Sequence, residues 1–111
     1  MQNVKWCYIE GTQRKYIITS KGKVFSKTKC NYLKPYINSN FNYKVNLTFY
    51  GYNKVTRSVS IYRLLEEYFP ESLNDKSLYC DIERKNQYEK LIKETEAELK
   101  EIYKWVNYIN Y

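Results

Sequence analysis

Tyr-Ile-Ile-Thr-Ser-Lys-Gly-Lys-Val-Phe-Ser, residues 16 to 26, is the part of the chain in which a β-hairpin can be recognised most directly. Tyr16 to Thr19 is rich in β-branched residues, which favour strands. The segment from Ser20 to Lys23 has the glycine and small polar residues of a turn, and Val24 to Ser26 follows as a short returning strand. These residues therefore predict two antiparallel strands joined by a tight turn.

Further short β-rich runs lie on both sides of this hairpin. Lys5 to Glu10 predicts a strand closed by Gly11. Residues 43 to 49 alternate apolar and polar side chains at period two, and after a turn at residues 51 to 53 the run from Val55 to Ile61 predicts a strand that pairs back. We expect a small antiparallel sheet of about four to six short strands.

The periodicity changes to that of helices after residue 60. Tyr62, Leu65 and Phe69 recur at helical spacing, Ser60 is a suitable N-cap, and the helix should stop before Pro70. Residues 71 to 79 read as a connecting loop. From about Asp81 the chain has no glycine or proline, so a long helix is predicted to the end, and the fold class is α+β.

The long helix carries a regular apolar seam. Its members are separated alternately by four and three residues over three heptads, which is an a/d pattern. The favoured interpretation is an amphipathic helix that docks on its own domain; pairing with a second copy in a homodimer and binding of another partner are the alternatives. The seam is Tyr88, Ile92, Thr95, Leu99, Ile102, Val106 and Ile109, of which Ile92, Leu99, Ile102, Val106 and Ile109 are the candidate docking or dimerisation residues.

With 111 residues the chain has room for one domain. We expect a single domain over 1–111, made of a basic β-module (1–60), a short helix and loop (61–80) and the long helix (81–111). No run approaches the roughly 20 apolar residues that span a bilayer, and the N-terminus lacks the apolar core of a signal peptide. A cytoplasmic location is therefore expected, as monomer or as homodimer through the C-terminal helix.

Positive charge is concentrated in the first part of the chain. The net charge is +7, but residues 1 to 60 carry eleven Lys and Arg against the single acid Glu10, whereas residues 61 to 111 carry eight against eleven. A coding bias towards lysine would act on both parts equally. The asymmetry therefore indicates a basic surface that faces a polyanion.

Lysines and arginines gather around the predicted hairpin and the loop that follows it, and tyrosines are interleaved with them. Cationic side chains bind phosphates and release counterions, and aromatic rings can stack on bases. The candidate polyanion-binding residues are Arg14, Lys15, Lys21, Lys23, Lys27, Lys29, Lys34, Lys44, Arg57 and Arg63. The candidate stacking or interface aromatics are Tyr32, Tyr36, Tyr50 and Tyr52, although packing competes as an explanation for any single tyrosine.

Residues suited to catalysis are scarce. The chain has no histidine, which removes the commonest general base and the commonest neutral metal ligand. Its three cysteines are far apart, and with only three glycines it has no phosphate-binding glycine loop. No catalytic residue, metal site or cofactor is predicted.

The order of motifs in the first seventy residues resembles the N-terminal nuclease-associated module of phage and intron HNH homing endonucleases. The resemblance covers about two-thirds of the chain and rests on the order and spacing of several short pieces. These are Trp6 and Ile9, the hairpin segment from Tyr16 to Ser26, Leu33-Lys34-Pro35, the alternating Tyr43, Val45 and Leu47, Tyr62-Arg63-Leu64-Leu65, and Phe69-Pro70. It implies a module associated with DNA and an origin in a phage or mobile element.

The chain departs from that family where the family does its chemistry. Tyr62 stands where the family has a histidine before Arg-Leu, and residues 78 to 83 read Leu-Tyr-Cys-Asp-Ile-Glu where an Asn-His-Ile-Asp type segment would begin the nuclease motif. In the family, histidine activates water and helps to hold the metal. The resemblance thus implies that the DNA-associated module is kept while the nuclease is lost.

Three hypotheses follow for the function. The first is a non-catalytic nucleic-acid-binding protein, with DNA favoured over RNA. The second is a small phage inhibitor that binds a host defence nucleoprotein such as a CRISPR effector, in a bacterial host cell if the chain is phage-encoded. The third and weakest is a magnesium-dependent nuclease that uses Asp75, Asp81 and Glu83.

Overall fold

The computed structural model describes residues 4 to 109, and side chains as far as residue 106. The chain separates into two units, residues 1 to 81 and residues 82 to 111, each of which is described by itself. The first unit contains β1 (Trp6–Tyr8), β2 (Tyr16–Thr19), β3 (Val24–Ser26), β4 (Asn31–Tyr32), β5 (Tyr36–Ile37), β6 (Tyr43–Tyr50), β7 (Lys54–Ser60), α1 (Ile61–Tyr68) and two 3-10 turns, Pro70–Asn74 and Lys76–Leu78. The second unit is α2 (Ile82–Ile109).

The predicted α+β class is confirmed, but the strands form two antiparallel sheets rather than one. The first sheet has the order β1-β2-β3-β4 and the second the order β5-β6-β7. Strands β4 and β5 have two residues each and carry no readable alternation, so sequence patterns could not reveal them. Pro35 lies between them, and since proline has no N–H to donate to a ladder, the chain leaves one sheet there and enters the other.

Two of the predicted strands match the structure residue for residue, whereas the predicted ends of the others differ. Strands β2 and β3 are as expected. Strand β1 is shorter than the expected segment from Lys5 to Glu10, although the amide of Ile9 still donates to the carbonyl of Tyr16 at 3.0 Å. Strand β7 begins and ends one residue earlier than expected, because Ile61 is already the first residue of α1. The expected loop over residues 71 to 79 is mostly wound into the two 3-10 turns.

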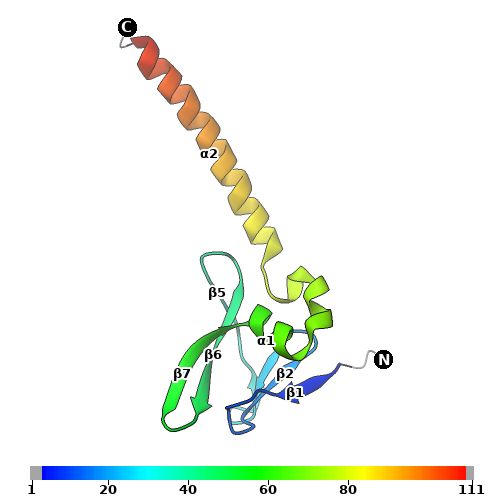
Figure 1. Cartoon of the computed structure of the whole chain (residues 1–111). Coiled ribbons are helices and arrows are strands. Elements are labelled where there is room, and N and C mark those ends of the chain that lie inside the picture. The colour runs from blue at the N-terminus through cyan, green and yellow to red at the C-terminus, as the bar shows by residue number, and fades with distance from the viewer. Residues whose placement is uncertain (1–3, 110–111) are drawn as a thin grey trace. The chain divides into compact units, whose positions relative to one another are not determined.

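Helix α1 contacts both sheets, and the core lies where the three meet (Figure 1). Ser60 is the N-cap, as expected, and its Oγ accepts a hydrogen bond from the amide of Arg63 at 3.1 Å. Ile18 from β2, Leu47 from β6 and Leu65 from α1 are fully buried. The complete core is Ile9, Ile18, Val24, Val45, Leu47, Ile61, Leu64, Leu65 and Phe69.

The β2–β3 turn lies in close contact with α1 and the 3-10 turns. Gly22, in the β2–β3 turn, has a φ of +75°, and a Cβ at this position would lie 3.0 Å from the carbonyl oxygen of Leu78 and 3.2 Å from a methyl group of Ile61. The hydroxyl of Ser72 donates to the carbonyl of Ser20 in the same turn at 2.7 Å. The hairpin turn therefore packs tightly against α1 and the 3-10 turns.

Candidate nucleic-acid interface

The first sheet presents one face to the core and the opposite face to solvent. Its register pairs Tyr8 with Ile17, Ile17 with Phe25 and Phe25 with Tyr32, so these side chains form one row across the sheet. Trp6 lies on the same face as Tyr8, because the two are separated by one residue in β1. Trp6, Tyr8, Phe25 and Tyr32, which we call the aromatic face, are not among the residues packed on the core, and Trp6 and Tyr32 are 56% and 60% exposed.

Edge-to-face pairs and cations organise the rings of the aromatic face. Trp6 meets Tyr8 and Phe25 meets Tyr32, each pair at a centroid separation of 5.4 Å. The guanidinium carbon of Arg14 lies 5.6 Å from the centroid of the Tyr8 ring, and the Nζ of Lys27 lies 5.2 Å from it. Two of the predicted polyanion-binding cations are therefore held at one end of the aromatic face by cation–π contacts.

Lys15 joins the two sheets at the same end of the unit. Its Nζ donates to the hydroxyl of Tyr50 at 3.0 Å, and this hydrogen bond lowers the pKa of Tyr50. The Nζ of Lys54 lies 5.9 Å from the same ring, and the amide of Tyr50 donates to the carbonyl of Gly11 at 2.7 Å. Tyr50 thus orients Lys15 and Lys54 and is not free to stack on both sides.

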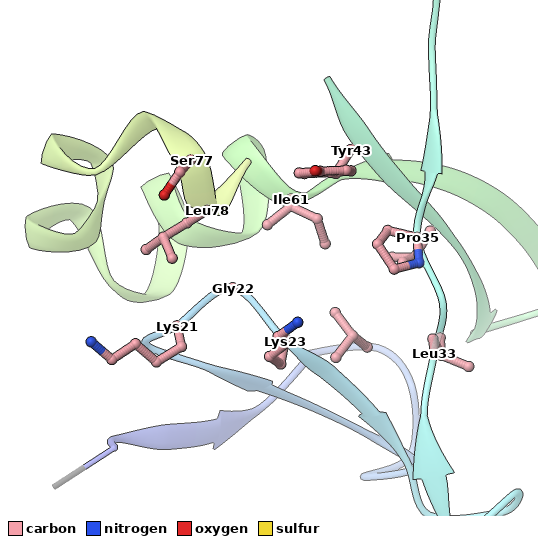
Figure 2. A pocket seen from close by; sticks show the side chains of 11 residues that line it. Lys21, Gly22, Lys23, Leu33, Pro35, Tyr43, Ile61, Ser77 and Leu78 are labelled. Carbon is pink, nitrogen blue, oxygen red and sulfur yellow. The ribbon is translucent and has the colours of Figure 1, made fainter. Parts of the chain in front are cut away.

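Lys21, Lys23 and Lys34 gather around a shallow groove that begins at the other end of the aromatic face. Tyr32 and Thr19 line this groove together with the three lysines. A neighbouring cavity of about 240 Å³ opens beneath the hairpin turn, with Lys21 and Lys23 on one side and Leu78 and Ile61 across from them (Figure 2). Three cations that are separated in sequence therefore meet beside an exposed ring.

The second sheet carries further candidates on the two-stranded ribbon of β6 and β7, in which β7 is mostly exposed and β6 is mostly half-buried or buried. Lys44 lies beside Tyr36 in the register, and the Tyr36 hydroxyl is hydrogen-bonded to Asn46 and Ser58. Tyr52, at the β6–β7 turn, is fully exposed, and Arg57 is exposed on β7.

Two candidate cations stand apart from these groups. Lys29 is exposed in the β3–β4 turn, where its amide donates to the hydroxyl of Ser26 at 3.2 Å. Arg63 lies on α1 in a groove that it shares with Glu66 and Glu67. Two acids line that groove, so it is a less suitable surface for a polyanion than the sheets are.

The positions that the resemblance relates to the family's histidines are occupied by packed side chains. The ring of Tyr62 packs edge-on against Tyr79, and the segment around Cys80 pairs with Asn42 in an antiparallel bridge. Asp75, a candidate ligand in the nuclease hypothesis, caps the second 3-10 turn by accepting from the amide of Ser77 at 3.1 Å. Within residues 4 to 109, the structure has no group of three or more acidic or cysteine side chains placed to hold a metal ion.

The seam residues of α2 are exposed as far as their side chains are described. Ile92, Leu99, Ile102 and Val106 are between 38% and 56% exposed, while the side chain of Ile109 lies outside the described residues. Docking and dimerisation through this seam both stay predictions. Among the residues that the structure describes, none of the helices combines the length and the apolar character of a membrane span.

Comparison with known proteins gives a match among solved structures. A similar structure is that of an HNH homing endonuclease. It is I-HmuI, in a structure described as "DNA binding and cleavage by the HNH homing endonuclease I-HmuI"; the two chains are 26% identical, with a TM-score of 0.48. The match covers 59% of this chain and 36% of the endonuclease, so this chain spans little more than a third of that protein. This is the family that the order of motifs indicated.

Comparison with protein-family models and with curated proteins gave no match.

Sequence patterns missed several residues of the aromatic face and of the cation groups around it. Trp6, Tyr8 and Phe25 were not among the candidate aromatics, and Lys54 was not among the cations. The alternation of Trp6 and Tyr8, and of Lys23, Phe25 and Lys27, is a signal that could have placed them on one face. That signal acquires meaning only when the register shows which strand faces are adjacent.

Proposed function

We propose that this chain is a non-catalytic nucleic-acid-binding protein of the HNH-endonuclease-associated type, with DNA favoured over RNA as its ligand. The observation that carries the proposal is the location of the excess positive charge. Residues 1 to 81 contain thirteen Lys and Arg against six Asp and Glu, and residues 82 to 111 contain six against six. All of the net charge of +7 therefore belongs to the unit that contains the sheets.

The distribution inside that unit supports the same function. Five of its six acids follow β7, on α1, the 3-10 turns and the segment that ends at Asp81, and Glu10 is the only acid on the sheets and their turns. Arg14, Lys15 and Lys27 gather at one end of the first sheet, and Lys21, Lys23 and Lys34 at the other. A surface with cations at both ends and few acids attracts the phosphate backbone over several nucleotides.

The ribbon formed by β6 and β7 is suited to a duplex groove. A two-stranded antiparallel ribbon fits the major groove of B-DNA. The polar face of this ribbon carries Lys44 and Asn46 on β6 and Thr56 and Ser58 on β7. Because the Oδ1 of Asn46 and the hydroxyl of Ser58 are hydrogen-bonded to Tyr36, and Thr56 to Thr48, base edges would meet chiefly the donors of Lys44 and of the Asn46 amide nitrogen. Preference for DNA over RNA rests on this shape and on the order of motifs shared with the homing endonucleases.

The proposal that the chain does not catalyse cleavage rests on the residues that stand where the homing endonucleases it resembles have their nuclease motif. Tyr62 and Tyr79 are phenols, which do not act as general bases near neutral pH, and the chain has no histidine. Asp75 is engaged as a turn cap. Binding without cleavage is the function that this arrangement supports best.

A mobility-shift assay tests the binding. The full chain is titrated at low ionic strength against duplex DNA, single-stranded DNA and RNA, and we expect complexes whose affinity falls steeply with salt. Reversing Lys21, Lys23 and Lys27 to Glu should reduce the magnitude of the salt slope by about 0.9 for each B-DNA phosphate that these lysines neutralise in the wild type. Reversing Lys90, Lys93 and Lys100 on α2 changes the net charge equally and should have a much smaller effect. Equal effects of the two triple variants, or no complex with any of the three nucleic acids, would contradict the proposal.

The inhibitor hypothesis requires a different result. A host protein would remain bound to the chain after nuclease treatment of the lysate, and the reversal of Lys21, Lys23 and Lys27 would release it. Loss of every partner on nuclease treatment favours nucleic acid as the direct ligand.

A further inference from the structure

The aromatic face of the first sheet is an unusual surface for a protein of this size. Trp6 and Tyr32 expose more than half of their surface, and they lie on the outer strands β1 and β4 with Tyr8 and Phe25 between them. Apolar rings of this size are normally buried, and each exposed ring leaves a large area of hydrocarbon in contact with water. Residues that are exposed together on one sheet face therefore indicate a binding surface.

The geometry points to a flat, extended ligand. Four strands at the usual spacing of about 4.8 Å place β1 and β4 about 14 Å apart. The ring of Trp6 packs edge to face against Tyr8 and the ring of Tyr32 against Phe25, so each exposed ring has a packing partner in the absence of a ligand. Preorganised rings bind planar groups with little loss of side-chain entropy.

Charge determines which planar ligand fits. Arg14 and Lys27 lie against Tyr8 at one end of the row, and Lys21, Lys23 and Lys34 share a groove with Tyr32 at the other. A ligand that covers the rings would therefore contact cations at both ends. Only a chain that combines planar apolar groups with regularly spaced negative charges satisfies both requirements.

We propose that the aromatic face binds unpaired nucleotides, with bases stacked on Trp6 and Tyr32 and the phosphates held by Arg14 and Lys27 at one end and by Lys21, Lys23 and Lys34 at the other. Single-stranded nucleic acid offers exposed base faces, whereas the bases of a duplex are stacked on each other and cannot cover a protein ring. A four-stranded sheet of this width accommodates two or three bases. The inference rests on the proposed nucleic-acid binding, which already uses the cations of the first sheet, and adds base stacking on the aromatic face as a role distinct from that of the β6–β7 ribbon.

Tyr8 has a different role from the two exposed rings. Because Arg14 and Lys27 both lie within cation–π distance of Tyr8, this ring positions cations for the phosphates and does not itself stack on a base. These separate roles predict that the binding free energy contributed by Trp6 and Tyr32 is lost when the ligand has no bases. The contribution of Arg14 and Lys27 should remain as long as the ligand has phosphates.

Tryptophan fluorescence gives a direct readout, since the chain contains only Trp6 and Trp105. In the full chain with Trp105→Phe, all tryptophan emission comes from Trp6. We expect quenching when an oligothymidylate of about ten nucleotides binds. Binding of this oligomer without a change in Trp6 emission would overturn the proposal.

Affinity measurements separate stacking from charge. By fluorescence anisotropy of a labelled oligothymidylate, Trp6→Leu and Tyr32→Leu should each weaken binding about five- to a hundredfold. Tyr103→Leu is the matched control, because Tyr103 is 65% exposed on α2, and it should change binding less than twofold. An abasic phosphodiester oligomer of the same length should bind wild type as weakly as oligothymidylate binds a variant that combines Trp6→Leu and Tyr32→Leu. Equal binding of the abasic oligomer and oligothymidylate to wild type would show that no base is stacked and would overturn the proposal.

Binding of duplex DNA, measured in parallel, separates failure of the stacking surface from failure of nucleic-acid binding as a whole. Binding of the duplex but not of the single strand overturns the stacking surface and leaves the proposed function standing, whereas failure of both ligands overturns both. Circular dichroism confirms that the variants are folded. A change in solution mass with Trp6→Leu or Tyr32→Leu, with affinity unaltered, would assign the face to a second copy of the chain and would also overturn the proposal.

Discussion

The ring of Tyr62 meets the ring of Tyr79 edge to face, with the centroids 5.0 Å apart. The hydroxyl of Tyr79 donates to the carbonyl of Leu73 at 3.2 Å, and burial raises the pKa of Tyr79. The phenol of Tyr79 therefore stays protonated at physiological pH. Tyr62 stands where the resemblance to homing endonucleases would place a histidine, and Tyr79 lies in the segment that the resemblance relates to the start of the nuclease motif.

Introducing a histidine at position 62 should not confer cleavage. With Tyr62→His the chain gains an imidazole, but Asp75 remains a turn cap and no cluster of metal ligands exists within residues 4 to 109. We expect supercoiled plasmid to remain intact with magnesium or manganese for both wild type and this variant. Nicking by the wild-type chain, abolished by Asp75→Asn or Asp81→Asn, would instead support the carboxylate nuclease hypothesis.

Gly22 should be more important for stability than Gly51. The backbone at position 22 is left-handed, with a φ of +75°, and a methyl group there would lie 3.0 Å from the carbonyl oxygen of Leu78. A methyl group at position 51 would have no other atom within 4 Å. We expect Gly22→Ala to lower the free energy of unfolding by at least about 1 kcal/mol, and Gly51→Ala to change it by less than about 0.5 kcal/mol. Urea unfolding followed by circular dichroism measures both. Equal destabilisation would mean that the turn does not pack against Leu78 in solution.

Stability should fall at alkaline pH, in part through Tyr68. Burial raises the pKa of Tyr68 above its ordinary value of 10.0, so the folded chain holds this proton more tightly than the unfolded chain does. The resulting stabilisation is fully present below pH 10 and is lost as the pH rises through the pKa of the folded state. Tyr68→Phe removes this ionisation and should flatten the decline in the free energy of unfolding above pH 10.

The same substitution has a separate effect at neutral pH. The amide of Glu10 donates to the Tyr68 hydroxyl at 2.8 Å, so Tyr68→Phe should reduce stability at pH 7 by about 0.5–1.5 kcal/mol. Tyr52→Phe, at a fully exposed position, is the control and should alter neither the stability at pH 7 nor the alkaline slope. If the free energy of unfolding falls equally steeply above pH 10 in wild type and Tyr68→Phe, ionisation of Tyr68 does not cause the loss of stability.

A glutamate placed in the α2 seam at position 99 should weaken the contacts of the seam, whereas a glutamate at position 100 should not. Leu99 belongs to the heptad pattern and is 45% exposed in the chain by itself, while Lys100 lies outside the pattern. If the seam pairs with a second copy or docks on its own chain, Leu99→Glu lowers either the solution mass or the thermal midpoint. Lys100→Glu should change neither quantity. Light scattering and thermal melts that are the same for both variants would contradict both interpretations of the seam.

Local patterns predicted those elements whose signals are complete within a few residues. The β2–β3 hairpin, the cap at Ser60 and the long helix have such signals, namely β-branched runs around a glycine turn, a hydroxyl at the N-cap, and a stretch without glycine or proline. Strands of two residues have none, so Asn31–Tyr32 and Tyr36–Ile37 were missed, and with them the split into two sheets. The 3-10 turns were read as loop because a turn held by contacts such as Ser72 to Ser20 depends on residues far away in the chain.

The sequence by itself determined the α+β class, the basic character of the first sixty residues and the lack of a histidine, because these depend on composition and on periodicity along the chain. Only the tertiary structure decided which side chains act together. Lys15 donates to Tyr50, thirty-five residues away, and Lys34 lines the same groove as Lys21. Pairing of the strands fixes the distances between these side chains, which local sequence patterns do not specify. The aromatic face follows from register in the same way: shifting β1 against β2 by one residue would turn Trp6 and Tyr8 towards the core.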